Sequence, residues 1–184
     1  GIFEIEDAIR PDSAETISSL KSAGYNCVLV TGDKKEIADS LSKQLNIDHT
    51  HSEVLPDEKA NIVTSYQDQG FIVAMVGDGI NDAPAIAQAD VGIAMGSGTD
   101  IAMETGEIVL AHGDLKAVLR ATRLASATFN KIKQNLFWAF IYNIIAIPLA
   151  FAGVLHPVMA EVAMALSSIN VVGNSNRLKS VKLN

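Results

Sequence analysis

Short apolar runs alternate with amphipathic stretches along residues 1–110 of the chain. The short runs predict strands at residues 2–5, 26–30, 71–76, 91–94 and 107–109. The amphipathic stretches predict helices at residues 13–23, 34–44, 57–69, 84–88 and 100–104. Strands that alternate with helices are typical of an α/β fold with a parallel sheet covered on both faces. The strand at 26–30 is expected to be buried on both faces, because Cys27–Val30 is apolar throughout.

The pattern changes after residue 114, where apolar residues dominate. Residues 136–155 contain no charged side chain and have the length that a helix needs to cross a bilayer. A helix buried inside a soluble protein is the alternative interpretation. Residues 157–173 form a second, weaker candidate span, which Glu161 interrupts, and Pro148 is expected to break the first helix.

Charged residues divide unevenly between the two parts. Residues 1–119 contain seven Lys and Arg against 20 Asp and Glu, whereas residues 120–184 contain seven against one. The acidic part argues against nucleic acid as a partner. Basic residues flank both candidate spans, which predicts cytoplasmic flanks and places residues 153–157 on the far side of the membrane. These basic residues are Lys131, Lys133, Arg177, Lys179 and Lys182.

The predicted organisation has four parts: an α/β domain at 1–114, a linking helix at 115–135, a transmembrane helix pair at 136–175 and a tail at 176–184. The protein is expected to be integral to the cell membrane, with residues 1–135 and the C-terminus in the cytoplasm. Cys27 is the single cysteine, which excludes a disulfide within the chain. His49 and His51 are expected on a surface loop. The chain starts at Gly1 rather than Met, so we expect it to begin within a longer protein or to be processed.

Two acids follow the strand at 71–76 on a glycine-containing loop. The segment Met75–Pro84, Met-Val-Gly-Asp-Gly-Ile-Asn-Asp-Ala-Pro, places Asp78 and Asp82 after the end of this strand. Ligands of open α/β sheets bind at the carboxyl ends of strands, and paired carboxylates at such a place suit Mg²⁺. Gly77 and Gly79 let the backbone approach a phosphate closely. A polar Asp-Gly turn is the alternative interpretation.

Two further segments have residues suited to binding a phosphate group. Thr31-Gly32-Asp33 follows the strand at 26–30, where a hydroxyl, a glycine amide and a helix N-terminus together suit a phosphate. Lys59 lies near the start of a helix, where its charge can offset that of a transferring phosphoryl group. Taken separately, the first segment is typical of a helix-capping turn and Lys59 of a solvated surface residue. Their order along the chain, ahead of the acidic loop, favours a combined site.

Together these segments resemble the haloacid-dehalogenase-like phosphotransferases, and the form GDGxNDxPA resembles the hinge motif of P-type ATPases. The resemblance extends to Asp7–Pro11 and Val91–Asp100 and covers essentially the whole chain. It implies a partial haloacid-dehalogenase-like (Rossmannoid) parallel sheet, followed by a transmembrane helical hairpin, as the C-terminal portion of a pump. The roles that it implies are Mg²⁺ binding for Asp78, support of metal and phosphoryl group for Asn81 and Asp82, phosphoryl contacts for Thr31 and Gly32, proximity to the nucleotide for Asp33 and charge compensation for Lys59.

The nucleophile of that family, the Asp of an Asp-Lys-Thr-Gly-Thr motif, has no counterpart in this sequence. An acyl phosphate requires a positioned carboxylate, so the chain alone is expected not to turn over ATP. The nucleophile strand of the family would lie beside Cys27–Val30, and its absence is expected to leave an exposed apolar edge. An N-terminal portion of the pump, in the same polypeptide or in a separate subunit, is therefore the implied partner. A catalytically inactive membrane regulator and a soluble phosphatase are the alternatives.

Polar residues inside the candidate spans are candidates for function, because they are costly in a bilayer. Tyr142 and Asn143 lie in the first span, and Met164, Ser167 and Ser168 share one helix face in the second. A thioether favours Cu(I) over hard cations, whereas hydrogen bonding between helices is the alternative role. The Tyr-Asn pair followed by Met-x-x-Ser-Ser resembles the last two helices of copper-type heavy-metal pumps.

Glu161 is similar to an acid associated with ion exit in those pumps, and interfacial snorkelling is the alternative. The Cys-Pro-Cys of the subgroup is absent from this sequence, so tight Cu(I) binding by the chain alone is not expected. The resemblance implies ATP-driven export of Cu(+) or Ag(+) with Mg²⁺ as cofactor. The partners implied are the lipid bilayer and a soluble copper chaperone.

Overall fold

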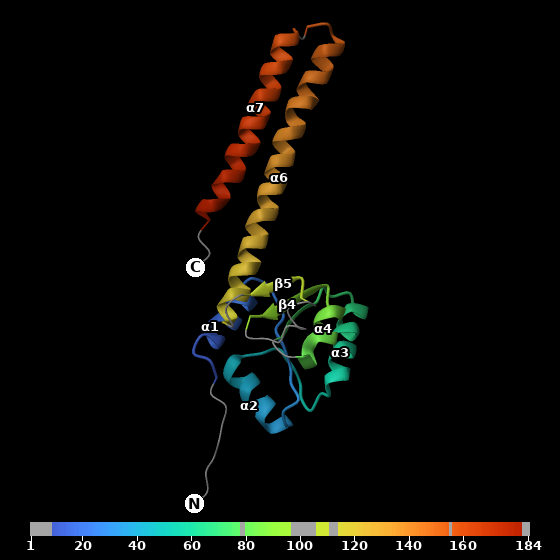
Figure 1. The fold of residues 1–184 in the computed structure, drawn as a ribbon, viewed down its shortest axis with the longest axis vertical. Coiled ribbons are helices and arrows are strands. Elements are labelled where there is room, and N and C mark those ends of the chain that lie inside the picture. Colours follow the sequence, from blue (N-terminus) through green and yellow to red (C-terminus); the bar gives the residue numbers. More distant parts are fainter. Residues whose placement is uncertain (1–8, 78–79, 97–105, 111–113, 155, 182–184) are drawn as a thin grey trace, which may run out of the picture. The chain divides into compact units, whose positions relative to one another are not determined.

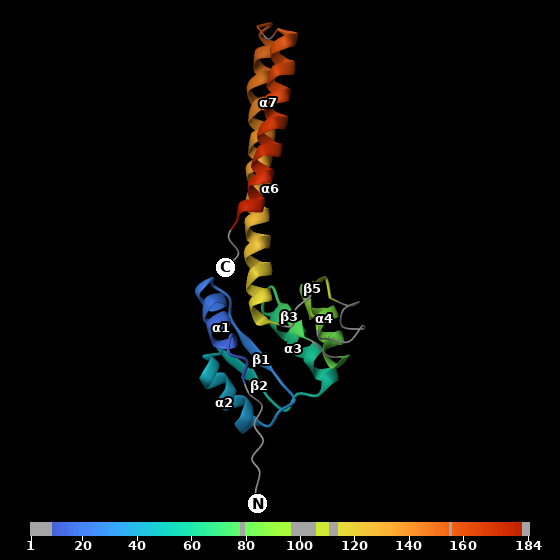
Figure 2. The ribbon, with the colours of Figure 1, turned by 60° about the vertical axis from the view of Figure 1, so that its left-hand side comes forward.

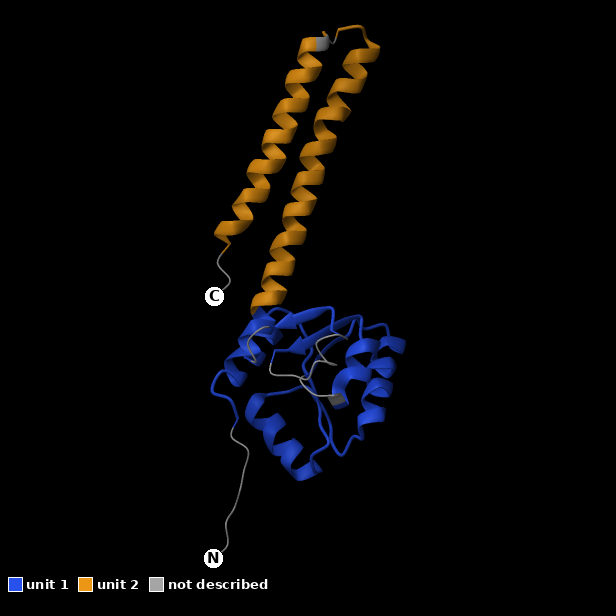
Figure 3. Ribbon diagram, viewed as in Figure 1, with its two compact units in different colours: residues 1–119 blue, residues 120–184 orange. Residues whose placement is uncertain are grey.

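The computed structural model describes residues 9–77, 80–96, 106–110, 114–154 and 156–181. The chain divides into two compact units, residues 1–119 and residues 120–184, which Figure 3 shows in different colours. The first unit contains strands and helices, and the second is helical. The boundary between them lies within the long helix α6.

The helices of the first unit begin and end at residues with clear local signals. α3 begins at Pro56, where a missing N–H removes no helical hydrogen bond. The Glu58 carboxylate accepts a hydrogen bond from the Leu55 N–H at 3.1 Å and caps the same end. α2 ends at Asn46, whose φ of 53° is the left-handed conformation common after helices. The helices that the structure describes before α6 are α1 (Ser13–Ser22), α2 (Lys35–Leu45), α3 (Pro56–Asp68), the 3₁₀ turn η1 (Ile80–Asp82) and α4 (Ala83–Gln88).

The described strands of this unit form two parallel sheets. β1 (Val28–Val30) pairs with β2 (His49–His51) in one of them. β3 (Ala74–Gly77), β4 (Val91–Met95) and β5 (Ile108–Leu110) form the other, in that order. α1 and α2 lie beside the first sheet, and α3 and α4 beside the second (Figures 1 and 2). The predicted α/β fold with parallel strands is confirmed.

β1 and β3 each pair with a described strand on one side only. All three residues of β1 are partly exposed, so the expected burial of this strand on both faces is wrong. By contrast, β4 lies between two strands and has four of its five residues buried. β1 lies in a sheet of two described strands, and an apolar strand is buried on both faces only where other elements cover both faces of its sheet.

His49 and His51 lie on β2, so their expected placement on a loop is wrong. Pairing with β1 makes this segment a strand, although His-Thr-His has no apolar pattern of its own. The Thr50 side chain hydrogen-bonds to the buried hydroxyl of Ser42 on α2. On α3, the hydroxyl of Tyr66 lies 3.1 Å from Nε2 of His51. Tertiary contacts thus determine this strand.

The first turn of α6 (Leu115–Phe151) packs on the first unit. Val118 in this turn is buried, with 5% of its surface exposed. Next to it, the Lys116 ammonium lies 2.8 Å from the Glu15 carboxylate on α1. The start of α6 is therefore part of the α/β unit.

The buried centre of the second sheet contains Ile86 of α4 and Ala94 of β4.

The second unit consists of the rest of α6, helix α7 (Pro157–Asn176) and the 3₁₀ turn η2 (Arg177–Ser180). α6 and α7 lie side by side and run in opposite directions (Figures 1 and 2). α6 continues through Pro148 to Phe151, so the expected break at Pro148 is wrong. Proline is tolerated in such apolar helices, because neighbouring groups and local adjustment satisfy the carbonyl that loses its partner.

Among the described residues, α6 is the one helix long and apolar enough, by length and composition, to cross a membrane. None of its apolar segment is buried within the chain. Phe137, Ile144 and Phe151 on this helix have exposed fractions of 60%, 63% and 90%. α7 is helical as predicted but does not meet the same criterion, so a second span stays a prediction.

Candidate functional site

The acidic loop begins where β3 ends at Gly77. A Cβ atom on Gly77 would lie 2.6 Å from Cβ of Asp82 and 2.8 Å from its Oδ2. Only a glycine allows this approach, since distances below about 3 Å are not observed for real Cβ atoms. The glycine therefore brings the Asp82 carboxylate directly against the end of the strand.

Lys59 on α3 forms an ion pair with this carboxylate. Its Nζ lies 2.7 Å from Oδ1 of Asp82. The two side chains have only 15% and 14% of their surface exposed. An ion pair this sheltered is screened less by water than a surface pair. The arrangement holds a positive and a negative charge together at the carboxyl end of β3.

The Thr31-Gly32-Asp33 turn lies at the carboxyl end of β1. The Thr31 hydroxyl donates to Oδ2 of Asp33 at 2.7 Å, and the Asp33 N–H donates to the Thr31 hydroxyl at 3.1 Å. The chain after β2 fixes the same turn, because the N–H groups of Glu53 and Val54 donate to the carbonyls of Asp33 and Thr31. These contacts stabilise the turn before α2, whose N-cap residue, Lys34, has no capping side-chain hydrogen bond.

The structure brings some of the predicted site residues together and not others. Lys59 and Asp82 are in contact, and Asn81 next to them is exposed. No hydrogen bond or ion pair joins the Thr31–Asp33 turn to Lys59 or Asp82 in the described part of the chain. Asp78 lies outside the described residues, as does Gly79. No group of three or more His, Cys, Asp or Glu side chains gathers among the residues that the structure does describe.

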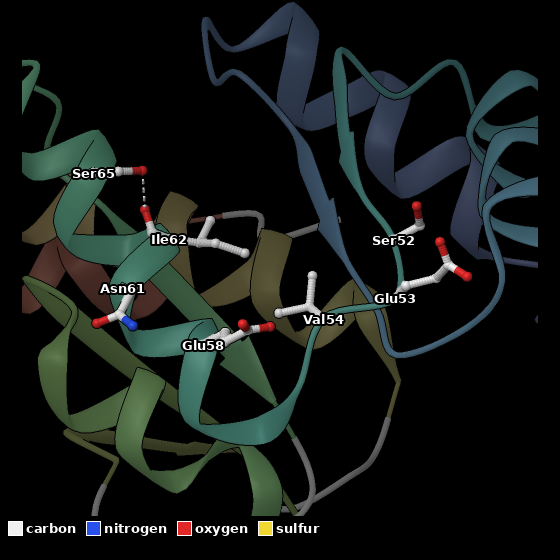
Figure 4. Close-up of a pocket in the computed structure, with 7 residues that line it drawn as sticks. All are labelled: Ser52, Glu53, Val54, Glu58, Asn61, Ile62 and Ser65. Atoms are coloured by element: carbon white, nitrogen blue, oxygen red, sulfur yellow. Dashed lines mark hydrogen bonds between the residues drawn. The ribbon is translucent and has the colours of Figure 1, made fainter.

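A shallow depression of about 340 Å³ lies at the junction of the β2–α3 connection and α3 (Figure 4). None of the predicted site residues lines it. The polar side chains around it serve local structure: Glu58 caps α3 and the Ser65 hydroxyl donates to the Ile62 carbonyl. The lining residues are Ser52, Glu53, Val54, Glu58, Asn61, Ile62 and Ser65. This depression therefore does not coincide with the proposed phosphoryl site.

The predicted ion-binding residues of the helix pair differ in what they contact. The Tyr142 hydroxyl accepts a hydrogen bond from Nδ2 of Asn170 on α7 at 2.8 Å. Asn143 is exposed and donates to the Ala139 carbonyl of its own helix at 2.9 Å. Tyr142 thus lies between the helices, whereas the neighbouring Asn143 does not.

On α7 the predicted residues also separate. Met164 has 70% of its surface exposed, and Ser168 is exposed, with its hydroxyl donating to the Met164 carbonyl at 3.1 Å. Ser167 is partly buried, and Glu161 in the first turns of the helix is exposed. No described contact joins Met164 to Tyr142. The thioether and two of the oxygen donors therefore lie on open surfaces of the helix pair.

A row of polar contacts that sequence reasoning missed connects the two helices. Asn174 on α7 donates to Oδ1 of Asn135 on α6 at 2.8 Å, and Asn135 donates to the Ser175 hydroxyl at 2.8 Å. The Lys131 ammonium donates to Oδ1 of Asn174 at 2.9 Å. These residues and Asn170 recur on α7 and α6 at helical spacing. That spacing of amide side chains is the signal that could have found them.

Comparison with known proteins agrees with this architecture. Residues 1–90 match the haloacid dehalogenase-like hydrolase family. A copper-exporting P-type ATPase of Legionella pneumophila is 48% identical over 190 aligned positions, covering 99% of this chain and 26% of that protein. A probable copper-importing P-type ATPase of Enterococcus hirae is 52% identical over 186 positions, again covering 99% of the chain and 26% of the relative. The chain thus spans about a quarter of the length of these curated relatives.

A solved structure resembles both parts of the chain. The crystal structure of a zinc-transporting PIB-type ATPase in its E2.Pi state superimposes with a TM-score of 0.88 and 37% identity. The match covers 94% of this chain and 28% of that one. Similarity to the copper pumps over nearly the whole sequence, together with this shared architecture, shows that the chain belongs to the P-type ATPases.

Proposed function

We propose that the chain forms part of a P-type ATPase that couples ATP hydrolysis to the transport of Cu(+) across a membrane. In this proposal, the first unit carries the Mg²⁺-binding and charge-compensating half of the phosphorylation site. The second unit supplies two membrane helices to the ion pathway. The observation that carries the proposal is the sheltered Lys59–Asp82 pair at the end of β3.

The chemistry of the donors in this loop fits Mg²⁺. Asp82 binds Lys59 through Oδ1 and offers its second carboxylate oxygen, Oδ2, and the exposed Asn81 beside it adds an amide oxygen. Oxygen donors of this kind are the ones that Mg²⁺ takes in proteins, usually with phosphate oxygens and waters. Asp78 would complete the set, as the resemblance implies. When bound, Mg²⁺ would neutralise charge on the phosphate oxygens.

The other residues would act on the phosphoryl group directly. Lys59 would offset its negative charge, since Nζ already lies at the same strand end as the carboxylate. Thr31 and Gly32 would donate a hydroxyl and an amide to its oxygens, and Asp33 would lie near the nucleotide. The carboxylate that accepts the phosphoryl group, with loss of ADP, would come from the N-terminal portion of the pump.

The open surfaces of the helix pair support a site shared with other helices. Tyr142 and Ser167 are partly buried, whereas Asn143, Met164 and Ser168 are exposed. Met164 is the soft donor of this set and favours Cu(+) or Ag(+) as the cargo. Glu161 would assist ion exit. The relatives are named as exporters and importers of copper, and we propose export, with a copper chaperone as the donor of the ion.

The test is formation of a phosphoenzyme from ATP labelled in its γ-phosphate, in membranes supplied with Cu(I). The chain alone is compared with the chain expressed together with, or fused to, the N-terminal portion of the pump. Asp78→Asn in the complete pump is the critical variant, and Asp57→Asn, a carboxylate in the first turn of α3, is its matched control.

Label is expected only when the N-terminal portion is present, and Asp78→Asn should abolish it while Asp57→Asn should not. Label on the chain alone would overturn the assignment of the nucleophile to the missing portion. Unchanged labelling of Asp78→Asn would overturn the Mg²⁺ role of the loop. No label in any combination would favour a catalytically inactive regulator.

A further inference from the structure

Asn170 is a polar side chain in the C-terminal half of helix α7, between Ile169 and Val171. Its amide nitrogen lies 2.8 Å from the phenolic oxygen of Tyr142, and both residues are partly buried. An amide in an apolar segment is costly unless it is paired. The contact therefore satisfies Asn170, and it also fixes the place of the tyrosine oxygen.

The direction of this hydrogen bond matters for the tyrosine. A phenolic oxygen has two lone pairs and one proton. Asn170 donates to one lone pair, and among the described residues no other hydrogen bond of this oxygen is found, so its other lone pair and its O–H can bind a further partner. The ring of Tyr142 is also limited by Trp138, whose ring centre lies 6.4 Å away. The oxygen is thus held by its contacts before any ligand arrives.

We propose that Asn170 is a positioning residue for the transported cation, acting through the Tyr142 oxygen. The inference rests on the proposed function, because it takes Tyr142 as a ligand of the cation. Residues that orient a metal ligand by hydrogen bonding reduce metal affinity when they are removed, typically by about 10- to 100-fold. Asn170 belongs to neither cluster that the sequence pattern singled out as ligands.

A separate set of contacts can hold the two helices together. Asn135, Asn174, Ser175 and Lys131 form a row of hydrogen bonds between α6 and α7 that does not include Tyr142. Loss of Asn170 should therefore leave the helix pair assembled. This row of hydrogen bonds also provides a matched control, since Asn135→Ala removes an equally short amide contact of the same helix pair.

The experiment measures Cu(I)-dependent ATP hydrolysis by the complete pump, with the Cu(I) concentration set by a chromophoric chelator. Asn170→Ala is expected to raise the KM for Cu(I) roughly ten-fold with little change in kcat. Tyr142→Phe should raise it similarly, and the double variant should add little to either, because the two residues act as one unit. Asn170→Gln, which keeps the donor, should recover part of the affinity.

Asn135→Ala should lower thermal stability but leave the KM for Cu(I) unchanged. An equal rise in KM for Asn170→Ala and Asn135→Ala would show a packing role and overturn the inference. So would an unchanged KM for Asn170→Ala, or fully additive effects with Tyr142→Phe. A wild-type pump that hydrolyses ATP without any response to Cu(I) would instead contradict the proposed function itself.

Discussion

The ammonium nitrogen of Lys59 lies 2.7 Å from Oδ1 of Asp82, although 23 residues separate them in the sequence. One residue comes from α3 and the other from η1, directly after the acidic loop. The two opposite charges compensate each other, and both side chains are largely buried. A phosphoryl group bound at the carboxyl end of β3 would lie near the positive charge of Lys59.

Replacement of Lys59 by Met should destabilise the first unit. The Asp82 carboxylate would be left sheltered without its partner, which typically costs about 1–3 kcal/mol. The double variant Lys59→Met with Asp82→Asn should lose less than the sum of the single losses. Thermal unfolding of the chain in detergent measures these differences, and Lys35→Met, an exposed lysine of α2, is the control. Strict additivity would show that the pair contributes nothing.

Gly77→Ala should displace the acidic loop. Its Cβ would lie 2.6 to 2.9 Å from three atoms of Asp82, so the carboxylate must move away from the strand end and from Lys59. We expect loss of phosphoenzyme in the complete pump and a lower unfolding temperature of the chain. Gly32→Ala is the steric control, because its Cβ would meet only the Val54 carbonyl at an ordinary 3.5 Å. That variant should unfold at nearly the wild-type temperature.

Asp48 should make the stability of the first unit depend on pH in the acidic range. Its carboxylate binds the Lys21 ammonium at 2.7 Å and accepts from the Cys27 N–H at 3.0 Å, and the two contacts hold the pKa of Asp48 below its ordinary value. A carboxyl group with a lowered pKa in the folded state stabilises the fold above the pKa of the unfolded chain, near 4. That contribution to stability disappears as the pH falls through the lowered pKa of Asp48 in the folded state.

Asp48→Asn should therefore reduce stability at pH 7, and the difference from wild type should shrink as the pH drops below about 4. Unfolding midpoints measured from pH 3 to pH 7 check this, with Asp68→Asn on the exposed end of α3 as the control for the substitution itself. A difference that stays constant down to pH 3 would show that Asp48 acts without its charge.

The sequence predicted the features whose signals are local. The helices at α1, α2 and α3 lie within a residue or two of their predicted bounds, because Pro56 and the polar residues around each end mark them. The parallel arrangement followed from the alternation of strands and helices. The resemblance of the acidic loop brought Lys59 and Asp82 into one hypothesis, and the structure places them in contact.

Features that depend on distant parts of the chain could not be predicted in this way. β2 has no apolar pattern, and only its pairing with Val28–Val30 makes it a strand. The contact between Asn170 and Tyr142 depends on how two helices face each other, which periodicity in one helix does not determine. β1 is partly exposed although its apolar run indicates burial, because burial depends on which distant elements cover the strand.

The orientation of the helix pair can be tested with single cysteines, since Cys27 is the only native one. After Cys27→Ala, a cysteine is placed at the exposed Ala152 in the connection between the helices or at Ser180 in η2. The basic flanks predict that a membrane-impermeant thiol reagent reaches Ala152→Cys from outside intact cells, and Ser180→Cys only after lysis. Labelling of both positions in intact cells would contradict a membrane hairpin.

The unpaired side of β1 should respond when the N-terminal portion of the pump is supplied. Residues Val28–Val30 are partly exposed, and β1, like β3, has a described neighbour on one side only. A strand inserted beside β1 would pair its free N–H groups and cover its apolar side chains. Hydrogen exchange at β1 should therefore slow markedly on addition of that portion, whereas exchange at β4, already between two strands, should change little. Equal slowing at both strands would indicate general stabilisation of the unit, and no slowing at β1 would contradict the completion of the sheet at this edge.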